Sequence, residues 1–304
     1  MVLTTNMKGA LFMAAAMAGF TINDALTKSL TTVMPVGQIM LLRGALTTLL
    51  VSVIAVQARA VISPRLLRNP FIMTRVLCEV FASITYLTAL SYIPLANAAS
   101  ILQSLPLAVT LGAALFLREP VGWRRWIAIL AGFVGVMIII RPGPEGFTLS
   151  SLYVLGSVFF AATRDLVTTR IDRSTPSIVV TWMTAAGNAL AGALLIPMEG
   201  GWQPVSSGNF SILVCAAVLM FVGYQCIIMA MRTAEISFIA PFRYSGLLWA
   251  IGLSIVVFGD WPDPWILVGM TVVVGSGLYA FHRERVLKSA IASQAAATAT
   301  VVTP

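Results

Sequence analysis

The sequence predicts an all-α membrane protein in which ten transmembrane helices form two inverted repeats of five helices each. Composition is the first support: of 304 residues, 59% are apolar and only 10% are charged. Soluble domains carry about 25% charged residues. An ordinary soluble enzyme and a disordered chain are therefore excluded, and the chain is expected to lie in a bilayer.

Ten stretches of the chain are long and apolar enough to cross the hydrocarbon core, which takes about 20 residues of helix. They lack the alternation of lipid-facing β-strands, and they are about twice as long as such strands. Short connections separate them at Pro35, Pro64, Pro120, Pro142, Pro176, Gly200 and Pro262. The predicted helices cover residues 9–29, 36–57, 70–92, 96–117, 123–140, 149–170, 176–197, 209–231, 236–258 and 263–281.

Lysine and arginine are distributed unevenly between alternate loops. Thirteen of them fall on the side of the chain ends, whereas the opposite side holds only Lys28 and Arg141. Because cytoplasmic loops are enriched in positive residues, both chain ends are expected in the cytoplasm of an inner-membrane protein. The same rule explains the net charge of +8 as a topology signal rather than a nucleic-acid surface.

The chain also resembles itself. A shift of 141 residues without a gap places Asp24 on Asp165 and Pro35 on Pro176. An odd number of helices per unit requires the second unit to be inverted, and inverted repeats are typical of secondary transporters. The predicted units are residues 8–141 and residues 149–282, followed by a cytoplasmic tail, 283–304, whose small-residue composition predicts disorder.

Several short motifs resemble the drug/metabolite transporter superfamily, in particular its branch with two EamA units. They are Asn23-Asp24 with Lys28, Pro106 followed by Leu117-Arg118-Glu119, and Ala240–Ser245 followed by Phe258-Gly259-Asp260. The resemblance spans residues 8–282, with Asp260 standing where glutamate is usual. It implies a central cavity lined by the first four and the sixth to ninth helices, with the fifth and tenth helices at the periphery.

The Pro241–Tyr244 stretch looks like the subgroup that contains riboflavin and S-adenosylmethionine importers. Aromatic amino-acid exporters share the fold but match this chain less well. The resemblance therefore implies transport of a small metabolite, with riboflavin uptake as the first expectation.

Charged residues inside a bilayer are costly unless they face a cavity or a partner, so they are the first candidates for substrate binding or gating. Asp24 and Arg43 lie at matching depths in the first two predicted helices, and we expect them to form an ion pair. This pair either locks the two helices together or acts in gating or substrate binding.

Glu79 lies near the middle of the third predicted helix. Either it binds a proton or cation, because desolvation favours its neutral form, or it is neutralised by Arg75 or Arg243. Asp165 is expected to meet Arg164, Arg170 or a polar group of the seventh predicted helix.

Aromatic and amide side chains within the spans complete the candidates. Rings inside a span, rather than at its ends, could stack on a planar solute, although each could also pack in the core or face lipid. The full set of substrate-binding or gating candidates is Asp24, Arg43, Glu79, Gln103, Trp182, Tyr224, Gln225, Arg243, Tyr244 and Trp249.

Enzyme chemistry is not expected. The single histidine, His282, follows the last predicted helix, and the sequence contains neither a zinc-protease HExxH motif nor a GxxxxGK[ST] phosphate loop. We expect no cofactor and no metal, and as partners a small-molecule substrate and the lipid bilayer, with a homodimer left open. The alternatives to uptake are export of amino acids or related metabolites and, in another class, a non-transporting scaffold or a channel.

Overall fold

In this computed structural model the chain consists of helices and their connections. The structure describes residues 5–57, 66, 68–118, 122–141, 149–172, 175–234 and 236–302, and these contain no β-strand. The helices are α1 (Thr5–Leu30), α2 (Val36–Gln57), α4 (Pro70–Tyr92), α5 (Leu95–Leu102), α6 (Leu105–Phe116), α7 (Trp123–Ile140), α8 (Leu149–Thr168), α9 (Ser177–Leu195), α10 (Ser207–Thr233), α11 (Ile236–Ile239), α12 (Ser245–Phe258) and α13 (Pro264–Val302), with 3-10 turns η1 (Ile196–Glu199) and η2 (Ala240–Tyr244).

Nine spans in the described part of the chain are long and apolar enough to cross a membrane, so the all-helical membrane architecture is confirmed. The one predicted span that is missing from these nine is the sixth along the chain. It corresponds to α8, which has 20 residues but includes Arg164 and Asp165. The count of ten stays a prediction, and it depends on whether these charges face protein rather than lipid.

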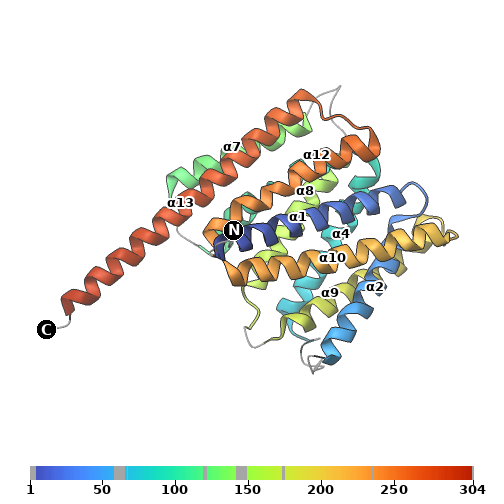
Figure 1. The fold of residues 1–304 in the computed structure, drawn as a ribbon, viewed down its shortest axis with the longest axis horizontal. Helices are drawn as coiled ribbons and strands as arrows, with labels where there is room; N and C mark the ends of the chain where they lie inside the picture. The colour runs from blue at the N-terminus through green and yellow to red at the C-terminus, as the bar shows by residue number, and fades with distance from the viewer. Residues whose placement is uncertain are drawn as a thin grey trace.

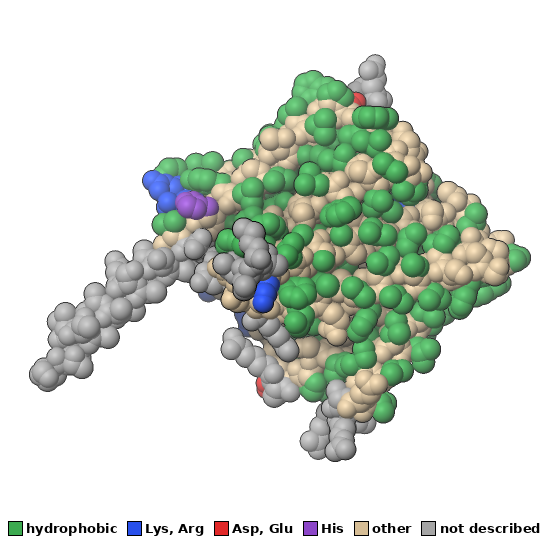
Figure 2. Space-filling view, viewed as in Figure 1, with side chains coloured by type: hydrophobic (Ala, Val, Ile, Leu, Met, Phe, Trp, Pro, Cys, Tyr) green, Lys and Arg blue, Asp and Glu red, His purple; other side chains and the backbone are tan. Residues whose placement is uncertain are grey.

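Large apolar side chains cover the outside of the helical body (Figure 2). Leu49, Leu115, Leu248 and Val256 are between 58% and 83% exposed. On a soluble protein such a surface would promote aggregation, whereas in a bilayer the lipid tails cover it. The chain is a multi-pass membrane protein.

Four helix pairs pack along much of their length: α1 with α10, α4 with α8, α2 with α9, and α7 with α13 (Figure 1). Exchanging the first five predicted helices for the second five converts the α1–α10 pair into the α8–α4 pair. The same exchange returns the α2–α9 and α7–α13 pairs to themselves. Two equivalent units would pack in this way, which supports the proposed duplication.

Two of the predicted helices are broken at prolines. The fourth is divided into α5 and α6 at Gln103 and Ser104, just before Pro106, and the ninth into α11, η2 and α12 around Pro241. Proline lacks a backbone N–H and clashes with the preceding turn, so it interrupts the hydrogen-bond ladder of a helix. Irregular backbone at this depth is tolerated where it is buried in protein or lines a cavity.

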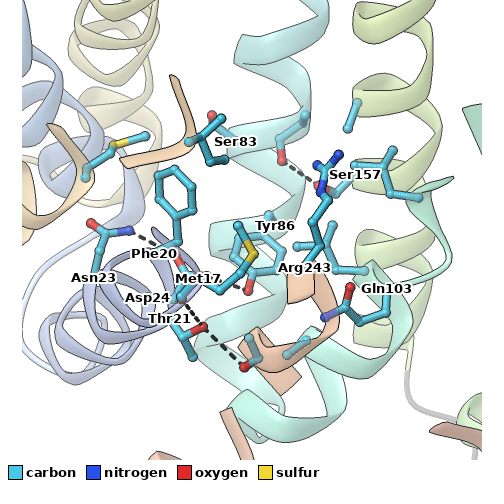
Figure 3. A pocket seen from close by; sticks show the side chains of 18 of the residues that line it. Met17, Phe20, Thr21, Asn23, Asp24, Ser83, Tyr86, Gln103, Ser157 and Arg243 are labelled. Atoms are coloured by element: carbon cyan, nitrogen blue, oxygen red, sulfur yellow. Dashed lines mark hydrogen bonds between the residues drawn. The ribbon is translucent and has the colours of Figure 1, made fainter. Parts of the chain in front are cut away.

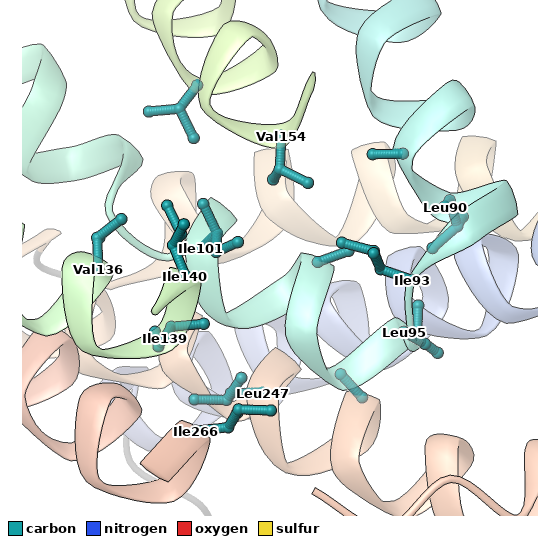
Figure 4. Packing of buried hydrophobic residues seen from close by; sticks show 14 of the residues in the cluster. Leu90, Ile93, Leu95, Ile101, Val136, Ile139, Ile140, Val154, Leu247 and Ile266 are labelled. Carbon is teal, nitrogen blue, oxygen red and sulfur yellow. The ribbon is translucent and has the colours of Figure 1, made fainter. Parts of the chain in front are cut away.

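The largest buried apolar cluster surrounds the junction between α4 and α5. Leu90, Ile93 and Leu95 of this junction belong to the same cluster as side chains of α7, α8, α12 and α13 (Figure 4). Lys28, at the end of α1, donates from Nζ to the carbonyl oxygens of Leu90 at 2.9 Å and Ile93 at 2.7 Å. This end of the helical body is therefore filled by side chains.

The segment 283–302, for which we expect disorder, continues α13 as helix away from the helical body (Figure 1). Its alanine-rich sequence has high helix propensity, which accounts for this. A helix without packing partners is marginally stable in water, so disorder of the tail stays a prediction.

The orientation of the chain can be tested with a reporter fused after Lys288. We expect activity only from a reporter that works in the cytoplasm, because the loop cations are concentrated on the side of the chain ends. Activity of a periplasmic reporter, such as a phosphatase, at the same position would contradict the predicted cytoplasmic placement of this end.

Asp263 immediately precedes α13 and gives a pH-dependent contribution to stability. Its Oδ1 accepts a hydrogen bond from the backbone N–H of Trp265 at 2.9 Å, and it pairs with Arg141. Both interactions favour the charged carboxylate, the first more strongly, so the pKa of Asp263 lies below its usual value.

Replacing Asp263 with Ala should lower the thermal stability of the protein at neutral pH. Because the folded-state pKa is lowered, the contribution is complete above the ordinary pKa of aspartate and is lost as the pH falls through the lowered value. Thermal unfolding of both proteins across this range should show the difference closing at acid pH. Asp263→Asn is the control, since it keeps the helix cap; a difference that does not change with pH would contradict the argument.

Candidate functional site

Two adjoining cavities lie within the helical body. The first has a volume of about 370 Å³ and is lined by residues of α1, α2, α4, α5, α6, α8, α10, η2 and α12, with Phe281 of α13. The second has a volume of about 240 Å³ and lies between α2, α4, α8, α9 and α10. Six residues line both cavities: Arg43, Glu79, Ser83, Arg164, Met220 and Tyr224.

Asp24 lies in the wall of the first cavity, where neutral donors satisfy its carboxylate. Tyr86 Oη donates to Oδ2 at 3.1 Å and Asn23 Nδ2 donates to Oδ1 at 3.0 Å (Figure 3). Arg43 donates instead to Thr27 Oγ1 at 3.3 Å. Among the described residues Asp24 and Arg43 form no ion pair at contact distance, so the predicted direct contact is wrong. Arg43 nevertheless attracts the Asp24 carboxylate, and both side chains line the same cavity.

Glu79 pairs with Arg164, and within the described part of the chain it forms no ion pair with Arg75 or Arg243, the two partners considered in one of the alternatives for this residue. Arg164 Nη1 lies 2.5 Å from Glu79 Oε2, and Arg164 Nη2 lies 2.8 Å from Asp165 Oδ1. The side chains of Arg164 and Glu79 are 21% and 13% exposed. The partner differs because α4 packs along α8, which brings Arg164 to the middle of α4.

The Arg164–Asp165 pair is among the contacts that the sequence predicts, and it is present. One guanidinium thus bridges two carboxylates at the boundary between the two cavities. These charges are held by protein groups, which removes the objection to α8 as a membrane span.

Aromatic rings line the first cavity beside these charges, among them those of Phe20, Tyr224 and Tyr244. Tyr224 lies edge-on to Phe20, with ring centroids 5.1 Å apart and an interplanar angle of 72°. Tyr244 is buried, and its hydroxyl has no hydrogen-bond partner among the described residues. Gln103, at the break between α5 and α6, supplies an amide to the same space.

The structure brings seven of the ten candidate residues to the first cavity: Asp24, Arg43, Glu79, Gln103, Tyr224, Arg243 and Tyr244. It places the other three outside the lining of both cavities. Trp182 donates from Nε1 to Ser52 Oγ at 2.8 Å between α9 and α2, and Gln225 and Trp249 lie at the surface. Aromatic character alone does not show which face of a helix is directed inward.

Several residues that line the cavities are not among the ten candidates, and Tyr86 and Arg164 are two of them. Tyr86 follows Glu79 by seven residues on α4, a spacing that places both on one helix face and was available as a signal. The pairing of Arg164 with Glu79 on α4 cannot be read from a single sequence, because it depends on how the two helices pack.

Comparison with known proteins agrees with this architecture. The model of the EamA-like transporter family matches residues 7–141 and 148–281. A riboflavin transporter of Vibrio cholerae is 31% identical over 66% of this chain and 68% of its own length. An S-adenosylmethionine uptake transporter of Rickettsia bellii is 26% identical over 71% of this chain and 74% of its own.

A pseudopaline exporter of Pseudomonas aeruginosa is 24% identical over 90% of this chain and 96% of its own length. A protein of known crystal structure shares the fold, with a TM-score of 0.64 at 20% identity over 92% of this chain and 98% of that one. Together with the paired family matches, these similarities lead to one conclusion: this multi-pass membrane protein belongs to the EamA-like transporter family.

Proposed function

We propose that this transporter moves a small, ring-bearing, polar metabolite across the cytoplasmic membrane, with riboflavin uptake as the first candidate. The observation that carries the proposal is the first cavity, in which aromatic and amide side chains surround a buried charged cluster. Its volume of about 370 Å³ lies in the range of small-molecule sites.

The lining of the first cavity suits a planar, hydrogen-bonding ring system. Phe20 and Tyr224 offer ring surfaces on which such a solute can stack. Gln103 offers an amide donor and acceptor. The relatives named as riboflavin and S-adenosylmethionine transporters both carry ring-bearing solutes by name, which supports the same class of substrate.

Alternating access is the mechanism that best fits two units of similar packing. Both units contribute to the cavity, the first through Asp24 and Glu79 and the second through Arg164 and Tyr244. In the proposed cycle, equivalent helices of the two units exchange roles to open one side and then the other. Lys28 closes the end that the charge pattern predicts to be outside, so the conformation described here is proposed to be closed to the outside.

Export is the second candidate, and a specific observation favours keeping it. The second cavity is lined by three arginines, which suits a carboxylate-bearing solute, and the pseudopaline exporter aligns over most of the chain. Both directions use the same cavities, and the gradient decides which way the solute moves.

Uptake into proteoliposomes tests the proposed function. Vesicles that contain the purified protein should take up labelled riboflavin in a saturable way, and excess unlabelled riboflavin should compete. Labelled S-adenosylmethionine and amino acids are tested in the same way as alternative substrates. Gln103→Ala should reduce uptake, because Gln103 lines the first cavity, and Gln225→Ala is the matched control at the surface.

Three outcomes contradict riboflavin uptake. Saturable transport of an amino acid alone would assign the exporter class, and an unsaturable, rapid ion flux would assign a channel. If the vesicles contain folded protein but show no flux of any solute, the protein would be assigned as a non-transporting scaffold.

A further inference from the structure

The second cavity has more positive than negative groups. Its wall holds the guanidinium groups of Arg43, Arg75 and Arg164 against the carboxylates of Glu79 and Asp165. Both carboxylates are bound by Arg164. Arg75 therefore forms no ion pair within the part of the chain that the structure describes. Arg43 forms none at contact distance there, although Asp24 in the wall of the first cavity attracts it.

Arg75 is held by a neutral group rather than by an acid. Its Nη1 donates to Thr184 Oγ1 at 2.6 Å, and its buried Nε has no hydrogen-bond partner among the described residues. The Thr184 hydroxyl in turn donates to the carbonyl oxygen of Val180 at 2.8 Å, which fixes its lone pairs toward Arg75. This arrangement orients a guanidinium toward the cavity while leaving donors free.

A cation in the membrane interior without a paired carboxylate is costly, so the energetic balance favours an anion next to Arg75, with Arg43 as a second donor in the same wall. The planar fork of arginine matches carboxylate and phosphate groups in particular, because it can donate two parallel hydrogen bonds. The hydroxyls of Thr47 and Thr181 line the same space and add polar lining.

The second cavity adjoins the first through the six residues that line both. We propose that it is an oxyanion subsite, in which Arg43 and Arg75 bind a carboxylate or phosphate group of the transported solute. The preferred substrate is then a ring-bearing organic anion, with its ring in the first cavity and its acidic group in the second. The assignment of the ring to the first cavity rests on the proposed function, whereas the oxyanion subsite itself does not.

Riboflavin and riboflavin 5′-phosphate are suitable probes, because they differ only by a phosphate group. Their binding to the full-length protein in lipid nanodiscs can be followed by quenching of flavin fluorescence. We expect the phosphate ester to bind about tenfold more tightly than riboflavin, since hydrogen bonds to charged groups contribute at least that factor. Arg75→Gln should remove this preference and leave riboflavin binding unchanged.

Two further variants keep the test decisive if Arg75→Gln does not fold. Asn188→Asp places a carboxylate in the wall of the second cavity, where it should compete with the oxyanion for the arginines and abolish the preference. Arg124→Gln removes a charge from the exposed start of α7 and is the control, which should retain the preference.

Inorganic phosphate and citrate separate the subsite from the proposed function. One possible result is that neither flavin binds, while phosphate and citrate raise the melting temperature of the wild type but not of the Arg75 and Asn188 variants. In that case the riboflavin assignment fails and the oxyanion subsite stands. Equal affinity for the two flavins, together with no protection by phosphate or citrate at constant ionic strength, overturns the subsite.

A lipid headgroup is the other source of a phosphate group. Nanodiscs of phosphatidylcholine and nanodiscs that also contain phosphatidylglycerol distinguish the two sources. Competition by phosphatidylglycerol against riboflavin 5′-phosphate would assign the subsite to lipid and overturn its role in binding the solute. We expect riboflavin 5′-phosphate to bind with the same affinity in both kinds of nanodisc.

Discussion

Replacing Arg164 with Gln is expected to destabilise the protein by about 3–5 kcal/mol, the usual cost of removing one partner from a buried ion pair. The cost is high because Glu79 and Asp165 both depend on this guanidinium, at 2.5 and 2.8 Å. Transport should be lost as well, since two uncompensated carboxylates would remain between the cavities. The loss of stability is measured by heating the detergent-solubilised protein and determining the fraction that stays monodisperse at each temperature.

Glu79→Gln is the informative comparison for Arg164→Gln. It leaves the guanidinium paired with Asp165, so a smaller loss of stability is expected. An equal loss from both changes would contradict the view that Arg164 serves both carboxylates.

The same variant tests whether Glu79 couples transport to protons. The contact with Arg164 favours the structural role among the two that the sequence left open, so Glu79→Gln should affect driven accumulation and downhill exchange equally. Loss of pH-driven accumulation with downhill exchange intact would assign the coupling site to Glu79, because glutamine keeps the shape but does not titrate.

Much of the fold follows from the sequence because bilayer thickness fixes helix length. The predicted spans 36–57, 70–92 and 123–140 coincide with α2, α4 and α7. The two broken helices were predicted as continuous, although Pro106 and Pro241 were visible. Hydropathy averages over about 20 residues and does not register the loss of one or two hydrogen bonds.

The partners within the site could not be predicted equally well. Matching depth suggested that Asp24 would meet Arg43, but depth gives no information on how a helix is rotated about its axis. Asp24 accepts hydrogen bonds from Tyr86 and Asn23, which are neutral and carry no electrostatic signal in the sequence, while Arg43 attracts it without direct contact. The rotation of each helix is set by packing, above all by small residues at the closest contacts.

Gly192 is at such a contact, where α9 crosses α2. A Cβ atom at Gly192 would overlap the backbone N of Leu41 and would lie 2.9 Å from the Cβ of Met40. On α2, a Cβ atom at Gly44 would likewise lie 2.9 Å from the Cα of Ala189. Backbone atoms cannot move aside as a side chain can, so any added group must separate the two helices.

Gly192→Ala is therefore expected to destabilise the protein by about 1–3 kcal/mol, the usual cost of overpacking. Gly275→Ala, in α13, is the matched control: no atom lies within 4 Å of its added Cβ, and alanine favours helix, so stability should stay equal or rise. Transport should also fall in the Gly192 variant, because α2 and α9 both contribute to the wall of the second cavity, through Arg43 and Thr184. Equal melting temperatures for the two variants would show that the α2–α9 contact is less close than described.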